Sequence, residues 1–200
     1  MCIRDRIATE AFAGGRDTGI AFILALGRPH AIINNPDGSE AHYKGLSLKG
    51  RLAIPVVEES VFGLDFYGVA RYVDLKNTAS DSVRQEVAQH LGAGIGMEVQ
   101  LTRFVVGVDY SHMMARHYGI GTVSGHLEFE MPLLKSYCGF TIPLDFLPIQ
   151  LTYSNAKSEI PTSATGFAEA SPYNEQAFWI HFKYSTGTSV GKLGKKLIKN

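Results

Sequence analysis

The sequence predicts an all-β protein that forms a closed, antiparallel, up-and-down barrel of about eight strands, and two observations support this fold class. Apolar and polar residues alternate with a period of two from about residue 44 onward, as in strands with one apolar face. The connections between these segments are alternately long and short. The longest apolar run, 19–27, is far shorter than the roughly 20 residues of a membrane-spanning helix, which excludes a helical membrane protein but not a strand-built one.

The expected strands follow one another along the chain. Residues 18–28 form the first, although its centre is apolar on both faces. Clean alternation then marks 44–56, 60–73, 86–101, 104–111, 126–133 and 178–184. A less regular strand, 136–153, changes phase near Pro143 and Pro148, where we expect a bulge or a break because proline cannot donate to a strand ladder. These segments predict a barrel domain over 18–187.

Both ends of the chain fall outside this domain. The opening MCIRDR, residues 1–6, resembles a translated sequencing-adapter scar, so we exclude it from the fold and expect the natural start to be missing. Residues 7–17 are a lead-in to the first strand, and 188–200 form a basic, lysine-rich tail.

The connections predict which ends of the strands lie together. The longer ones are 29–43, 74–85 and 154–175, with a medium one at 115–122, and the short turns are Glu58-Glu59, Thr102-Arg103 and Leu134-Lys135. An even number of antiparallel strands returns the chain to the side where it started. Both ends of the barrel domain should therefore lie with the short turns.

Alternation alone does not tell whether the apolar face points inward, as in a soluble barrel, or outward to lipid, and three observations favour lipid. The polar face mixes glycines with charged and histidine residues, as a narrow, filled interior requires. Its charges nearly balance, which a closed interior needs because an isolated buried charge is very costly. Aromatic residues near strand ends suit interfacial girdles, namely Tyr72, Phe104, Tyr110, Tyr137 and Tyr184.

Two sets of residues follow from this choice of face. The expected polar network of the lumen comprises Lys49, Arg51, Asp65, Arg71, Glu98, Asp109, His126, Glu128, Glu130, His181 and Lys183. The expected lipid-facing residues are Phe62, Leu64, Phe66, Ile95, Met97, Val106, Val108, Phe129, Phe178, Ile180 and Phe182.

This layout resembles the bacterial outer-membrane β-barrel superfamily, specifically its small, eight-stranded, porin-like members, over roughly 18–187. The resemblance rests on architecture, without a diagnostic motif. It implies an integral outer-membrane protein with a filled lumen and a structural or surface-interaction role. Such a protein contacts membrane lipid, is handled by the barrel assembly machinery and stays monomeric.

Composition excludes other classes. With 19 basic and 19 acidic residues the charge balances, so no nucleic-acid partner is indicated. Cys2 and Cys138 provide no disulfide framework or metal-ligand spacing, and no cofactor or metal is expected.

Two alternatives stay open beside this reading. A lipid-modifying enzyme resembling lipid A deacylases would need a His-x-Ser pair, but no histidine is followed two residues later by serine, and Thr152 stands at the histidine position before Ser154. Ser124, His126 and Glu128 share one face of an expected strand. Neighbours on one face are about 7 Å apart along the strand, which is too far for a hydrogen-bonded triad. The other alternative is a soluble, lipocalin-like barrel that binds a small apolar ligand. We expect no catalysis.

Overall fold

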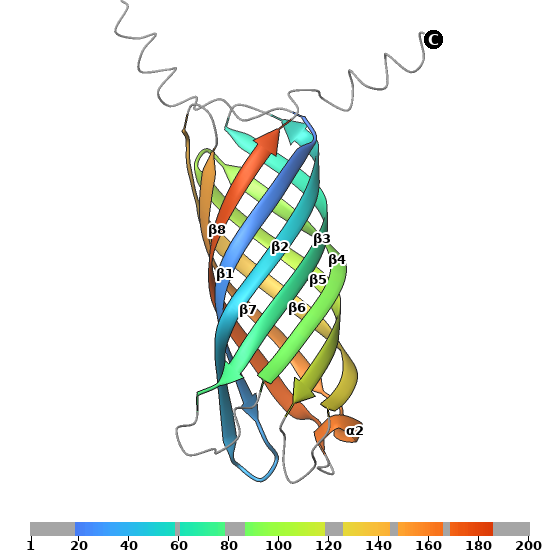
Figure 1. Cartoon of the computed structure of the whole chain (residues 1–200). Helices are drawn as coiled ribbons and strands as arrows, with labels where there is room; N and C mark the ends of the chain where they lie inside the picture. The colour runs from blue at the N-terminus through green and yellow to red at the C-terminus, as the bar shows by residue number, and fades with distance from the viewer. Residues whose placement is uncertain are drawn as a thin grey trace, which may run out of the picture.

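The computed structural model describes residues 19–58, 61–78, 87–118, 126–144, 148–165 and 169–185. Eight antiparallel strands follow one another round a closed barrel, and β1 pairs with β8 to close it (Figure 1). The strands are β1 (Ala21–Asn34), β2 (Glu40–Glu58), β3 (Phe62–Asn77), β4 (Val87–Leu101), β5 (Phe104–Tyr118), β6 (His126–Ile142), β7 (Ile149–Ile160) and β8 (Ser171–Ser185). The predicted fold class is confirmed. The N-terminal segments 1–6 and 7–17 and the tail 188–200 lie outside the described residues.

The register of the strands fixes the tilt and the width of the barrel. Starting at Gly27 and stepping from each residue to its cross-strand partner through β2, β3, β4 and β5, one reaches Phe129 on β6. Stepping the other way round the barrel, through β8 and β7, one reaches Gly139 on the same strand. The two end points differ by ten residues, which is the stagger of the closed sheet. Such a stagger requires strongly tilted strands, typically at about 35–45° to the axis, and the tilt is plain in Figure 1. An eight-stranded barrel encloses a space just wide enough for side chains to fill.

The connections divide between the two ends as expected. At the end where β1 begins and β8 ends, β2 is followed by β3, β4 by β5 and β6 by β7 (Figure 1). At the other end, β1 is followed by β2, β3 by β4, β5 by β6 and β7 by β8. We call these the short-turn end and the loop end. A short helix, α2 (Thr162–Thr165), lies at the loop end. Within the described residues, no helix has the length and apolar character to cross a membrane.

Three expected boundaries are wrong. The predicted loop 29–43 is a turn over 35–39, because β1 and β2 stay paired as far as Asn34 and Glu40. Within this turn Ser39 donates to the Asp37 carboxylate through its hydroxyl and its backbone N–H, which lowers the pKa of that carboxyl below its usual value. The predicted loop 154–175 shrinks to 161–170, because β7 continues to Ile160.

The predicted turn at Leu134-Lys135 is the third error, because β6 runs straight through these residues. The actual turn lies between Pro143 and Pro148, the prolines at which the sequence predicted a break. The expected strands 126–133 and the first part of 136–153 are therefore one strand, and the rest of 136–153 begins β7. The predicted number of eight strands is correct only because two errors cancel: β6 was divided at Leu134-Lys135, and its second part was joined to β7.

Glycines on the inner face allow β4 to approach β5 and β3 closely. A Cβ at Gly94 would overlap the backbone of Tyr110 and Ser111 on β5. A Cβ at Gly96 would overlap the ring of Tyr67, its cross-strand partner on β3. The Gly-x-Gly-x-Gly stretch of β4 is therefore a space-making element of the lumen.

Candidate functional site

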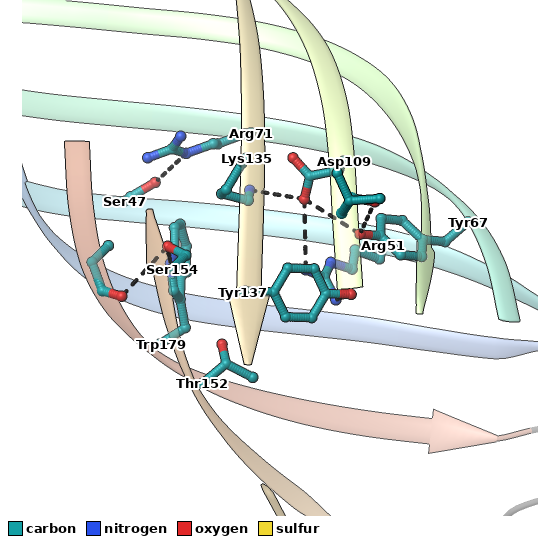
Figure 2. A network of polar contacts seen from close by, with 12 residues as sticks. Ser47, Arg51, Tyr67, Arg71, Asp109, Lys135, Tyr137, Thr152, Ser154 and Trp179 are labelled. Carbon is teal, nitrogen blue, oxygen red and sulfur yellow. Dashed lines mark hydrogen bonds and ion pairs between the residues drawn. The ribbon is translucent and has the colours of Figure 1, made fainter. Parts of the chain in front are cut away.

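The lumen contains a buried ion network centred on two acids from neighbouring strands. Asp109 on β5 lies with its Oδ2 2.9 Å from Lys135 Nζ and 3.7 Å from Arg51 Nη2, and both cations are almost completely buried (Figure 2). Figure 2 shows that these side chains come from opposite parts of the wall and converge inside it. Asp109 thus links β5 to β6 and to β2 across the interior.

Glu98 on β4 is the second acid of this network. Its carboxylate accepts hydrogen bonds from Arg51 at 3.3 Å, from the Tyr137 hydroxyl at 2.8 Å and from Gln150 at 3.1 Å. The Arg51 guanidinium also lies between the rings of Tyr67 and Tyr137, 4.4 and 4.5 Å from their centroids. A charged group removed from water is held here by acids and by aromatic faces together.

A further pair lies farther toward the loop end. Arg71 on β3 pairs with Glu175 on β8 and donates to the hydroxyl of Ser47 at 3.2 Å. The Tyr173 hydroxyl donates to Glu175 at 3.0 Å. At the short-turn end, Lys183 Nζ lies 3.8 Å from Asp65 Oδ2, a looser and slightly exposed pair.

Lys49 is held mainly by an aromatic ring. Its Nζ lies 4.1 Å from the centroid of Trp179, and no carboxylate pairs with it among the described residues. The Trp179 indole in turn donates to Ser154 Oγ at 2.8 Å (Figure 2). His181 and Thr152 form a neighbouring buried pair at 2.9 Å. A cation over an indole face is a favourable substitute for water in such a place.

Beyond this network, toward the loop end, the interior becomes apolar. The members of this apolar layer are Ala31, Ile33, Tyr43, Val73, Leu75, Ala88, Met113, Ala115, Phe129, Met131, Leu133, Ala156, Ile160, Ala164 and Tyr173. Ala164 belongs to α2, which therefore contributes to the layer. His90 and His117 stack beside these residues with their Nε2 atoms 3.1 Å apart. The lumen thus consists of two zones, a charged one and an apolar one.

The outer wall has the opposite arrangement. From the short-turn end, outward side chains are apolar on every strand, apart from Ser136 on β6. Toward the loop end they become polar, for example at Arg28 after Leu26 and at Lys44 before Leu46. On β5 and β6 this polar rim carries the pairs Arg116–Glu128, at 2.7 Å, and His112–Glu130, at 2.9 Å. We call the apolar part the belt and the polar part the rim.

This change of polarity overturns three of the expected placements. Glu128 and Glu130 were expected in the lumen but point outward, with 44% and 65% of their side chains exposed. Phe129 was expected on the lipid side but points inward and belongs to the apolar layer. Strands of 12 to 19 residues exceed the roughly 9–11 that a tilted strand needs to cross a bilayer, so they continue past it. Beyond the belt, the outer face is polar and the inner face supplies the apolar core.

The remaining expected residues lie as follows. The structure places these expected lumen residues on the inner face: Lys49, Arg51, Asp65, Arg71, Glu98, Asp109, His181 and Lys183. It places these expected lipid-facing residues on the outer face: Phe62, Leu64, Phe66, Ile95, Met97, Val106, Val108, Phe178, Ile180 and Phe182. The side chain of His126 lies outside the described part of the chain. Tyr137 was expected in an interfacial girdle but is buried in the lumen.

Sequence reasoning missed several members of the network, among them Lys135, Tyr137, Gln150, Tyr173 and Glu175. Lys135 and Tyr137 were hidden by the false turn, and Glu175 and Tyr173 by the overlong loop. Extending the outward phase of Cys138 and Phe140 back along β6 would have turned Lys135 and Tyr137 inward. The alternation carried the necessary information.

The candidate chemistry of the sequence does not assemble. Ser124 lies outside the described residues, and Glu128 points outward into a pair with Arg116. Thr152 and Ser154 were expected at a strand end near a loop but lie inside the lumen, bonded to His181 and Trp179. Within the described residues, no three His, Cys, Asp or Glu side chains form a group able to hold a metal.

Solved structures of small outer-membrane β-barrels share this closed eight-stranded fold. No family model matches the sequence, and no curated protein matches it. Neisserial surface protein A matches with a TM-score of 0.51 and 13% identity over 82% of this chain and 99% of that one. Ail of Yersinia pestis, solved with the heparin analogue sucrose octasulfate, matches with a TM-score of 0.51 and 11% identity over 84% and 100%. At these identities the likeness shows the fold, and it confirms the expected resemblance at that level.

The network predicts that breaking a buried ion pair lowers the free energy of unfolding much more than breaking an exposed one. Replacing Arg71 by Met leaves Glu175 charged and unpaired in the lumen, and should lower the free energy of unfolding by roughly 3–5 kcal/mol. Arg116→Met, which breaks a half-exposed pair on the rim, should cost no more than about 1 kcal/mol. Urea unfolding in lipid vesicles measures both. The double variant R71M/E175M should recover much of the loss, and equal losses for R71M and R116M would contradict the assignment.

Proposed function

We propose that this chain is an integral β-barrel of the bacterial outer membrane that acts as a lipid-embedded scaffold for surface interactions, without a conducting lumen and without catalysis. The observation that carries the proposal is the outer wall, on which an apolar belt gives way to a polar rim on every strand. For a protein surrounded by water, a continuous apolar outer wall around a charged interior would be energetically unfavourable.

The height of the belt supports a membrane position. On β2 the outward residues stay free of charge from Leu46 to Val56, and on β4 from Leu91 to Leu101. Each stretch has the roughly 9–11 residues that a tilted strand needs to cross a bilayer. The soluble-barrel alternative requires the reverse arrangement, with an apolar interior behind a polar wall, and the barrel has this arrangement only at the loop end.

The interior supports a scaffold over a channel. Buried side chains of the ion network fill the middle of the lumen, and the apolar layer follows it toward the loop end. Interaction is then left to the loop end, where the three longest connections, β3 to β4, β5 to β6 and β7 to β8, lie. The structure of Ail with a heparin analogue is consistent with such a role for a barrel of this fold. On this proposal, membrane lipid and the barrel assembly machinery are its partners, and it stays monomeric.

A lipid-modifying activity is disfavoured by the outer wall itself. His112 and Glu130 form an exposed histidine–carboxylate pair on the rim, which would suit a general base oriented by an acid. Two residues after this histidine, however, Met114 points outward where a His-x-Ser pair would carry its serine. Without a nucleophile the pair is a surface ion pair.

The membrane position predicts opposite outcomes for two changes on one strand. Ile180→Arg places a charge in the middle of the belt on β8 and should cost roughly 2–4 kcal/mol of stability in lipid. Gln176→Arg lies on the same outer face but on the rim, where a charge meets water, and should change stability little. Unfolding titrations in vesicles compare the two. A barrel that tolerates both changes equally well does not use this wall to face lipid.

The orientation predicts which turns are reachable from outside the cell. In a chain with Cys2 and Cys138 replaced by Ser, Pro36→Cys at the loop end should react with a membrane-impermeant maleimide on intact cells. Thr102→Cys at the short-turn end should react only after the cells are lysed. The reverse pattern would turn the barrel over and place the loop end in the periplasm.

The filled lumen predicts an absence of steady, porin-like conductance in planar bilayers. Eight strands leave space for side chains only, whereas the 16–18 strands of porins enclose water. A porin reconstituted in the same way serves as the positive control. Large, stable currents through the purified barrel would contradict the packed network.

A further inference from the structure

A groove of about 520 Å³ runs across the belt on the outer wall of β2 to β6. Its lining is apolar apart from the Tyr110 hydroxyl: Ile54, Phe66, Tyr67, Gly68, Ile95, Gly96, Met97, Val108, Tyr110 and Leu134. Its volume falls within the roughly 300–1,000 Å³ of ordinary ligand sites. No charged side chain lines it, unlike the lumen behind it.

Register explains how the groove arises. One wall is a row of cross-strand partners, Gly68, Ile95, Tyr110 and Leu134, and the other is the row Ile54, Phe66, Met97 and Val108. Gly68 leaves a gap in the first row, because a Cβ there would meet no atom within 4 Å. Tyr67 and Gly96 alternate with these residues and face the lumen, so they contribute backbone to the floor.

The groove crosses the belt obliquely, because its two rows follow the register of tilted strands. On β2 it reaches Ile54, close to the short-turn end of the belt, and on β4 it lies at Ile95 and Met97 in mid-belt. On β5 it ends at Tyr110, one step of about 7 Å from His112 on the rim. On the proposed membrane position, an occupant of the groove therefore lies at the depth of the lipid acyl chains.

We propose that this groove binds one acyl chain of a membrane lipid, held there longer than the chains around the rest of the belt. The inference rests on the proposed membrane position. At the depth of the belt acyl chains are the molecules present at the groove, and its lining, apolar apart from the Tyr110 hydroxyl, suits such a chain better than a polar partner. An unfilled hollow would lose dispersion contacts on both sides, and in lipid such packing is a main source of association.

Two glycines on the same wall provide the test. Gly68→Leu should fill the groove without a clash, since the space beyond its Cα is open. Gly50→Leu adds the same side chain to the outer face of β2, where a Cβ also meets nothing within 4 Å, but Gly50 does not line the groove. Gly68→Ala is a smaller step for the case in which leucine disturbs folding. Heat-modifiable gel migration shows that each variant is folded.

The readout is the number of motionally restricted lipids per barrel, measured by electron paramagnetic resonance with phosphatidylcholine spin-labelled on its acyl chain. The wild type and G50L should agree, and G68L should lose one restricted lipid. Equal counts for all three folded proteins would overturn the inference while leaving the membrane position intact. Loss of a cross-linked dimer in G68L, with an unchanged lipid count, would assign the groove to a second copy and overturn it as well. Failure of the wild type to enter vesicles would instead overturn the proposed function.

Discussion

The burial of four cations inside a narrow wall is the constraint on which the rest of the lumen depends. Lys49, Arg51, Arg71 and Lys135 are each at most 2% exposed. Taking such charges out of water is tolerable only where other groups replace the water, because an isolated buried charge costs far more than a fold can supply. Acids satisfy part of this need, and aromatic rings over Arg51 and Lys49 satisfy another part.

The glycines belong to the same requirement. Gly27 is the cross-strand partner of Trp179, Gly96 of Tyr67 and Gly107 of Tyr137. At each of these glycines a Cβ would overlap the ring of its partner, so the glycine provides the space in which the ring lies over its neighbour strand. Those rings then contact Lys49 and Arg51. The stabilisation of each cation thus depends on an aromatic ring, and the position of that ring depends on a glycine in the neighbouring strand.

Period-two alternation was enough to predict the barrel, its up-and-down order and most of the polar lumen. It was not enough for β6, where the same phase carries Glu128 and Glu130 outward in one half and Cys138 and Phe140 outward in the other. Alternation indicates which residues share a face of the strand. Whether the polar face points inward or outward depends on what surrounds that part of the barrel, which the alternation does not indicate. Around Leu134-Lys135 the outward residues change from polar to apolar while the strand continues, and this change in pattern resembles a turn. Strand length would have indicated it, since β6 has 17 residues, more than a bilayer crossing needs.

The two zones of the lumen also determine where function can reside. The ion network lies behind the apolar layer, so a charged or polar solute entering from the loop end must first displace Met113, Met131 and Phe129, which are nearly or fully buried. It must then break ion pairs whose charged groups are out of contact with water, which is energetically costly. The same layer keeps water from the network and so strengthens the attraction between its charges. This packing is why the proposed function assigns no path for solutes to the lumen, and assigns recognition to the loop end and lipid contact to the outer wall.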